Sequence, residues 1–97
     1  MIVLNVTYRC RPGMRDRFLE AITAEGIDQA SRAETGNLKF DYYLPAAGGD
    51  ELLLVEKWKG TGAIAEHMGQ AHYLWLKALK ETYVDETVIE RFETDRV

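Results

Sequence analysis

The sequence predicts an α+β fold with one sheet and one layer of helices, in the element order βαββαβ. Three observations support this order. Four segments are rich in β-branched and aromatic residues, apolar residues recur at helical spacing between them, and glycine or proline turns separate the segments. This is the ferredoxin-like arrangement, in which helices cover one face of a four-stranded antiparallel sheet. With 97 residues the chain has room for one core, so we expect a single domain over residues 1–97.

The first half of the chain is expected to contain a strand, a helix and a second strand. Residues 2–9 alternate between two faces, and Pro12-Gly13 ends this strand. Apolar residues at helical spacing begin at Met14, and the helix is expected to continue less regularly to Ala33. Gly36-Asn37 then ends it as a left-handed cap or a turn, before a strand over residues 38–44.

The second half is expected to add a strand, two helices and a last strand. The sequence PAAGGD at residues 45–50 is a hairpin-length turn that leads into a strand over residues 51–59. A short helix over residues 63–68 has Thr61 as its expected N-cap. The next helix carries a regular apolar stripe, Ala71, Leu74, Trp75, Ala78 and Leu79. The last strand is expected over residues 87–93.

The third strand is apolar on both of its sides, which indicates that both faces of the sheet are covered. Leu52 to Val55 are consecutive apolar residues, whereas a sheet with one wet face normally alternates apolar and polar residues. The chain has too few elements to cover the second face itself. We therefore expect a homodimer in which two sheets pack face to face, the alternative being a monomer with an apolar surface.

Composition and charge exclude several classes of partner. The net charge is −4 and no run of Lys or Arg is present, which argues against nucleic acid. The third strand, ELLLVEKW, also lacks the basic and stacking residues of RNA-binding sheets. Gly60-Thr61-Gly62 is spaced like a dinucleotide-binding loop, but the predicted antiparallel sheet lacks the parallel βαβ frame that such a loop needs.

The sequence also indicates a cellular compartment. No apolar stretch approaches the ~20 residues that span a bilayer, so no membrane association is expected. No signal peptide is evident at the N-terminus. Cys10 is the only cysteine, which excludes an intrachain disulfide and a cysteine-held cluster. We expect a cytoplasmic location.

Two histidines are the first candidates for chemistry. His67 shares the i, i+3, i+4 face of its helix with Ile64 and Met68, so it should point inward. A half-buried imidazole titrates near neutral pH and can act as a general base, the alternative being a structural histidine bonded to a backbone carbonyl. His72 lies five positions further on, which is not the i, i+4 spacing of a metal-binding pair. We therefore expect no metal site.

Asn5, Glu56 and Trp58 are further candidates. Asn5 lies in the middle of a strand, where its amide either bonds a neighbouring element or stabilises a developing oxyanion. Glu56 is expected to pair with a cation such as Arg9 or Arg91. Trp58 is expected either in the core or in the wall of a pocket.

Several of these segments resemble the antibiotic biosynthesis monooxygenase (ABM) domain family. The resemblance rests on GNLKFD at residues 36–41, on Glu56 and Trp58 at the end of a strand, and on His67 and His72-Tyr73 in the helices that follow. It covers nearly the whole chain. It implies a dimeric α+β barrel with a pocket between sheet and helices in each subunit.

The resemblance also implies a cofactor-independent monooxygenase that acts on a quinol or a related aromatic molecule and on O2. A base removes a proton from the substrate, and the electron-rich anion then reduces O2 itself. In this interpretation His67 is the base and Asn5 stabilises the anion. Trp58 and Phe40 wall the pocket, and His72 or Tyr73 helps to position the substrate.

Two alternatives stay open. One branch of the family, similar to this chain around GNLKFD and His72-Tyr73, contains isomerases of autoinducer-2 breakdown, which implies acid–base isomerisation of a small carbonyl compound. A non-catalytic ligand-binding dimer is the other alternative. Haem degradation is not expected, because His67 and Lys77 stand where the haem-degrading branch has its Trp and its iron-binding His.

Overall fold

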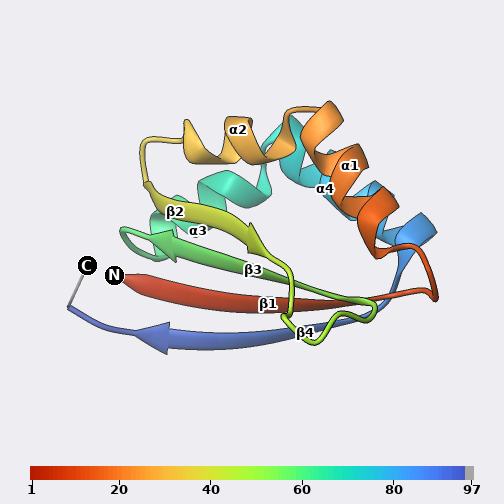
Figure 1. Cartoon of the computed structure of the whole chain (residues 1–97). Helices are drawn as coiled ribbons and strands as arrows, with labels where there is room; N and C mark the ends of the chain where they lie inside the picture. The colour runs from red at the N-terminus through yellow and green to blue at the C-terminus, as the bar shows by residue number, and fades with distance from the viewer. Residues whose placement is uncertain (96–97) are drawn as a thin grey trace.

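The structure, a computed structural model, describes residues 1–95 and has the predicted ferredoxin-like α+β fold (Figure 1). Its elements are β1 (Ile2–Cys10), α1 (Arg15–Ala24), α2 (Ile27–Arg32), β2 (Asn37–Tyr43), β3 (Glu51–Trp58), α3 (Thr61–Met68), α4 (Ala71–Tyr83) and β4 (Val84–Glu93). The helices form one layer and the strands form the other (Figure 1). None of the helices within residues 1–95 combines the length and the apolar character that crossing a lipid bilayer requires.

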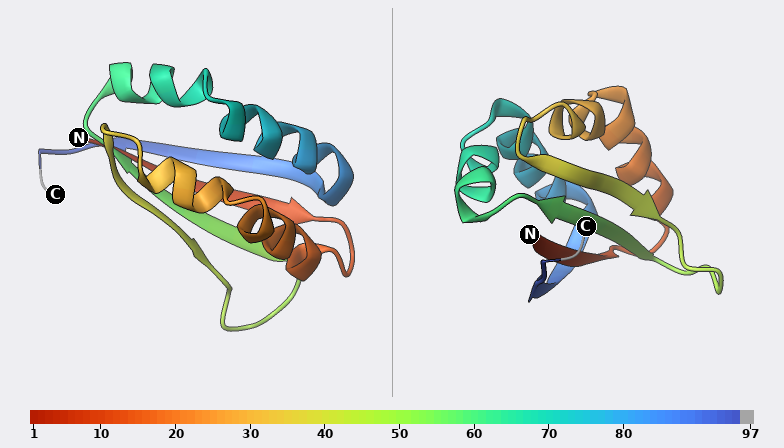
Figure 2. Two further views of the ribbon diagram at one scale, coloured as in Figure 1. Left: turned by 90° about the horizontal axis from the view of Figure 1, so that it is seen from above. Right: turned by 90° about the vertical axis from the view of Figure 1, so that its left-hand side faces the viewer.

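The strands form an antiparallel sheet in the order β2-β3-β1-β4. Successive residues of a strand point to opposite faces, so the register sorts the side chains into two sets. Val6 of β1 lies opposite Leu54 of β3 and Ile89 of β4, and these three side chains share the face beneath the helices. Asn5 lies opposite Val55, and this set forms the other face. All helices lie over the first face (Figure 2).

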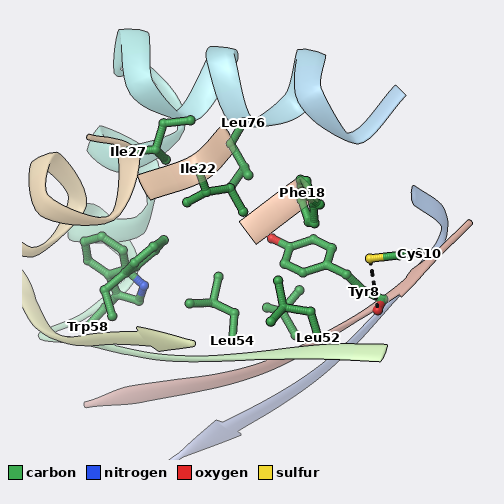
Figure 3. Close-up of a cluster of buried hydrophobic side chains, with 11 residues drawn as sticks. Tyr8, Cys10, Phe18, Ile22, Ile27, Leu52, Leu54, Trp58 and Leu76 are labelled. Atoms are coloured by element: carbon green, nitrogen blue, oxygen red, sulfur yellow. Dashed lines mark hydrogen bonds between the residues drawn. The ribbon is translucent and has the colours of Figure 1, made fainter. Parts of the chain in front are cut away.

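The core fills the layer between the sheet and the helices. Phe18 and Ile22 of α1 meet Leu52, Leu54 and Trp58 of β3, and all five are 0% exposed. Figure 3 shows these side chains extending toward one another from the two layers. Each fully buried leucine, isoleucine or phenylalanine contributes about 1.5–3 kcal/mol, so this contact holds the helices on the sheet.

Two helix boundaries differ from the sequence prediction. The segment after Met14 forms two helices, because Gly26 adopts a positive φ of 68° and separates α1 from α2. Thr61 is the first residue of α3 and not its N-cap. Gly60 occupies the N-cap position, and no side chain caps the helix. The expectation for Thr61 was wrong because the helix begins before the apolar residues that marked it in the sequence.

Gly36 is a close-approach residue and not a left-handed cap. Within residues 1–95 the glycines with positive φ do not include it. A Cβ added to Gly36 would lie 2.3 Å from the Cβ of Ala63. The missing side chain therefore lets the turn between α2 and β2 pack directly against α3. This contact brings the turn close to His67, at the end of the same helix.

The face of the sheet opposite the helices is also apolar, as the sequence predicts. The register places Val3, Leu53, Val55, Val88 and Phe92 on this face. Phe92 is 49% exposed, and no helix of residues 1–95 lies over this side of the sheet (Figure 2). The cover that the sequence predicts for this face, a second copy of the chain, remains a prediction.

We predict that Gly36→Ala lowers the free energy of unfolding by about 1–3 kcal/mol, because the new methyl group forces α3 away from the turn. Gly62→Ala is the matched control, since a Cβ at Gly62 meets no atom within 4 Å. We expect the control to be neutral or to raise stability by less than about 1 kcal/mol, because alanine favours the helix. Urea unfolding followed by circular dichroism measures both. Equal midpoints for the two variants would contradict the prediction.

Candidate active site

A cavity of about 220 Å³ lies between the sheet and the helices α3 and α4. Most of its lining is apolar, but a glutamate, a histidine, two tyrosines and two lysines also line it. Such a cavity, apolar with a few convergent polar groups, is the usual form of a small-molecule site. The lining residues are Leu4, Val6, Tyr8, Glu56, Ile64, His67, Met68, Tyr73, Leu76, Lys77, Lys80, Thr87 and Ile89.

His67 enters the cavity from the last turn of α3 and is 5% exposed. Its Nδ1 lies 2.5 Å from Oε2 of Glu34. A carboxylate can only accept, so the Nδ1–H of the imidazole donates this hydrogen bond. Within residues 1–95 no hydrogen bond uses Nε2, which leaves that nitrogen as the one able to accept a proton from a ligand.

The environment of His67 favours a neutral imidazole. Burial lowers the pKa of His67, and the hydrogen bond and charge of Glu34 oppose this shift only in part. At pH 7 the ring is therefore uncharged, with a lone pair on Nε2. This is the form that acts as a general base.

Glu34 connects two histidines. Its Oε2 also lies 2.8 Å from Nε2 of His72, in the first turn of α4. Glu34 itself stands in the turn between α2 and β2, beside the Gly36–Ala63 contact. One carboxylate oxygen therefore ties together three separate segments of the chain.

Glu56 brings a carboxyl group into the cavity from β3. It is 7% exposed, and its Oε1 accepts a hydrogen bond from Nε1 of Trp58 at 2.9 Å. Burial raises the pKa of Glu56 to about 7. The expectation that Glu56 pairs with Arg9 or Arg91 was wrong. Arg9 lies on the opposite face of the sheet, and within residues 1–95 Arg91 makes no ion pair. Near neutral pH much of Glu56 is a neutral acid that can donate a hydrogen bond.

Two tyrosines add hydroxyl groups. Tyr8 and Tyr73 both line the cavity, and the ring centroid of Tyr73 lies 5.2 Å from that of His67. Burial raises the pKa of the Tyr8 hydroxyl, which therefore stays protonated. Figure 3 shows the Tyr8 ring extending from β1 into the layer between sheet and helices.

The structure places the other predicted pocket residues around His67. Trp58 and Phe40 are 0% exposed and do not line the cavity. Their ring centroids lie 4.6 Å and 5.7 Å from that of His67, so both rings pack against the imidazole. His72 reaches Glu34 and not the cavity.

Asn5 is not brought together with the other candidates. It lies opposite Val55 and Glu90, on the sheet face that points away from the helices. Leu4 and Val6, its neighbours in β1, line the cavity. Within one copy of the chain Glu56, and not Asn5, is the group placed to interact with an oxygen of the ligand.

Sequence reasoning missed Glu34 and the two lysines. Glu34 lies 33 positions from His67 in a short turn, where no periodic pattern marks a partner. The lysines could have been found. Lys77 and Lys80 share the face of α4 that carries Tyr73 and Leu76, at the i, i+3, i+4, i+7 spacing of one helix face.

The two histidines and Glu34 are also the residues that could hold a metal ion. One ligand atom from each lies within 4.8 Å of the others. The sequence predicts no metal site from the spacing of the two histidines, whereas the fold adds Glu34 as a third possible ligand. Two imidazole nitrogens and a carboxylate form a donor set that zinc or another transition metal accepts. In the structure these atoms hydrogen-bond one another, which keeps Nε2 of His67 available to a ligand.

Comparison with known proteins gives consistent matches. Residues 1–78 match the family described as antibiotic biosynthesis monooxygenase. The putative monooxygenase YcnE of Bacillus subtilis (strain 168) is 34% identical over 73 residues, which cover 75% of each chain. A structure from Nitrosomonas europaea, titled as a putative antibiotic biosynthesis monooxygenase, shares the fold at a TM-score of 0.88 and 23% identity and covers 99% of this chain and 100% of that one. The structure of Rv0793 from Mycobacterium tuberculosis has a TM-score of 0.84 at 26% identity, with 99% and 96% covered.

We predict that Glu56→Gln flattens the pH dependence of stability. The pKa of Glu56 is about 7 in the folded chain, against a usual value of 4.5. A carboxyl whose pKa is raised on folding stabilises fully below its unfolded pKa, and this contribution is lost as the pH rises through the folded pKa. The wild type should therefore lose up to about 3 kcal/mol, relative to Glu56→Gln, between about pH 4.5 and about pH 8. Urea unfolding across this range measures the difference, and parallel curves would contradict it.

Proposed function

The chain belongs to the antibiotic biosynthesis monooxygenase family, and we propose that it is a cofactor-independent monooxygenase that oxidises a quinol-type aromatic molecule with O2. One observation carries this proposal. A neutral imidazole, His67, has its Nδ1 held by Glu34 and faces an apolar cavity. This reaction requires from the protein a general base in a pocket that excludes water.

The cavity residues divide the chemistry between a base and an acid. Nε2 of His67 accepts a proton from a phenolic hydroxyl, and the resulting anion supplies the electrons that reduce O2. The O–O bond and one ring C–H bond break, one oxygen atom becomes a hydroxyl group on the resulting quinone, and the other leaves as water, so the quinol supplies all four electrons. The protonated carboxyl of Glu56 donates a hydrogen bond to the substrate oxygen on which negative charge develops. Glu34 acts through His67 as a positioning residue.

A second function, acid–base isomerisation of a small carbonyl compound, is favoured by one observation. His67 and Glu56 face the same cavity, and a base and an acid so placed can move a proton between adjacent carbon atoms. An isomerase of a phosphorylated, sugar-like substrate is expected to turn a cation, Lys39, Lys57 or an Arg, into the pocket. None of these lines the cavity, but Lys77 and Lys80 do. Oxygen consumption separates the two reactions, because isomerisation needs none. A binding module would show neither reaction and would keep its ligand affinity in His67→Ala.

We propose further that the chain forms a homodimer through the apolar sheet face. Val3, Leu53, Val55, Val88 and Phe92 lie on that face, with Asn5, Thr7 and Glu90 between them. A second sheet packed face to face would remove this surface from water. The same packing would enclose Asn5, which in this arrangement serves the interface and not the cavity.

A cytoplasmic location is part of the proposal. Cys10 is buried and unpaired, so no disulfide supports the fold. Proteins that depend on oxidising compartments usually carry disulfides. The quinol substrate and O2 are both able to reach a cytoplasmic enzyme.

We predict that His67→Ala lowers the turnover of quinol substrates by about 10²–10⁴-fold, the usual contribution of a general base. The measurement is oxygen uptake by purified protein freed of metal and flavin, with a panel of quinols. His72→Ala is the comparison variant and should lose less activity, because His72 acts only through Glu34 and does not face the cavity. Full activity in His67→Ala would end the assignment of the base.

Glu34→Gln tests the positioning role in the same assay. Removing this charge lowers the pKa of His67 further, because Glu34 is the group that raises it. The acid limb of kcat/KM should therefore move to lower pH. A merely structural role for Glu34 would reduce activity without moving that limb.

We predict that Leu53→Asp converts the dimer into monomers, because an aspartate in the centre of the apolar face buries an unpaired charge. Analytical ultracentrifugation measures the mass. Leu74→Asp is the matched control, since Leu74 is 55% exposed on α4, in the helix layer. A monomeric wild type, or a Leu53→Asp variant of dimer mass, would contradict the proposed interface.

A further inference from the structure

We infer that the cavity takes a single-ring aromatic acid, whose ring lies in the apolar part and whose anionic group is bound by Lys77 and Lys80. The inference deepens the proposed function, because it names the substrate class of the same site. It is carried by the arrangement of α4, by the absence among residues 1–95 of a carboxylate paired with either lysine, and by the size of the cavity.

The cavity-facing side of α4 changes character along its length. Tyr73 and Leu76 line the cavity from the first half of the helix, and Lys77 and Lys80 line it from the second half. The two lysines are three positions apart, so they lie on one face of the helix. A ligand that extends along α4 therefore meets aromatic and aliphatic groups near His67 and then two cations.

Within residues 1–95 neither lysine forms an ion pair with a carboxylate. Among residues 1–95, the ion pairs of neighbouring acids are made with arginines, Asp85 with Arg11 and Glu86 with Arg9. Glu81, one turn beyond Lys77, makes no ion pair with either lysine in this part of the chain.

Both lysines line the cavity, Lys80 as a half-buried residue and Lys77 as an exposed one. Nζ of Lys80 lies 5.6 Å from the ring centroid of Tyr8, a residue that also lines the cavity. Burial and the charge of Lys77 lower the pKa of Lys80. The charge of Lys77 disfavours the charged form of the half-buried Lys80, and a bound anion would relieve this repulsion.

The size of the cavity restricts the rest of the ligand. An apolar cavity of about 150 Å³ holds one benzene molecule. The cavity here has a volume of about 220 Å³, which leaves room for one ring with small substituents. A ring hydroxyl can then face Nε2 of His67 while an acidic substituent points toward the lysines. A carboxylate and a phosphate offer the same oxygen acceptors to Lys77 and Lys80.

The test is binding without turnover, by calorimetry under anaerobic conditions, with phenol, 4-hydroxybenzoate and phenyl phosphate as probes. We expect at least one of the two anions to bind about 10-fold more tightly than phenol, which is the range of a charge-assisted hydrogen bond. The two anions distinguish a carboxylate site from a phosphate site. High salt should weaken the binding of the anion and not that of phenol.

Variants assign the effect to the lysines. Lys77→Gln and Lys80→Gln should each remove most of the preference for the anion, and Lys77→Arg and Lys80→Arg should retain it. Lys59→Gln is the matched control, because Lys59 is exposed and does not line the cavity. Equal binding of phenol and both anions, or a preference that survives in the Lys77→Gln/Lys80→Gln double variant, would overturn the inference. Because no turnover is needed, anion binding by a protein that shows no oxygen uptake with the quinol panel would refute the proposed oxygenase and leave this inference standing.

Discussion

The structure depends on the two-residue period of β3, which places a carboxyl group in a row of buried apolar side chains. Leu52, Leu54 and Trp58 point toward the helices and are fully buried. Glu56 lies in the same row and cannot turn away without reversing the face of the whole strand. The burial that holds the helices on the sheet therefore also fixes an acid in the cavity.

Burial has the largest influence on the protonation of the two central groups. Removing water disfavours the charged form of any group, so it lowers the pKa of His67 and raises the pKa of Glu56. A neutral base and a neutral acid thus face one apolar cavity near pH 7. Neither His67 nor Glu56 needs a counter-ion in its neutral form, so the cavity needs few charged residues in its lining. Lys77 and Lys80 are the exception, at the other end of α4.

The orientation of the base comes from contacts between distant segments. The turn after α2 approaches α3 closely because Gly36 has no side chain to meet Ala63. That approach puts the carboxylate of Glu34 within hydrogen-bond distance of His67 and also of His72 on α4. A carboxylate held by two ring N–H groups has little freedom, so the His67 ring is oriented from one side while Trp58 and Phe40 pack against it from others.

The sequence by itself determined the order of elements, the two faces of each strand and the inward direction of His67, because these follow from periodicities of two and 3.6 residues over short stretches. Alternation along β1 already separated Asn5 from Leu4 and Val6, but only the tertiary structure showed which set the helices cover. Glu34 joined the site by a contact across 33 positions. No local pattern encodes such a contact, because it depends on how the turn after α2 packs against α3 once the sheet has formed.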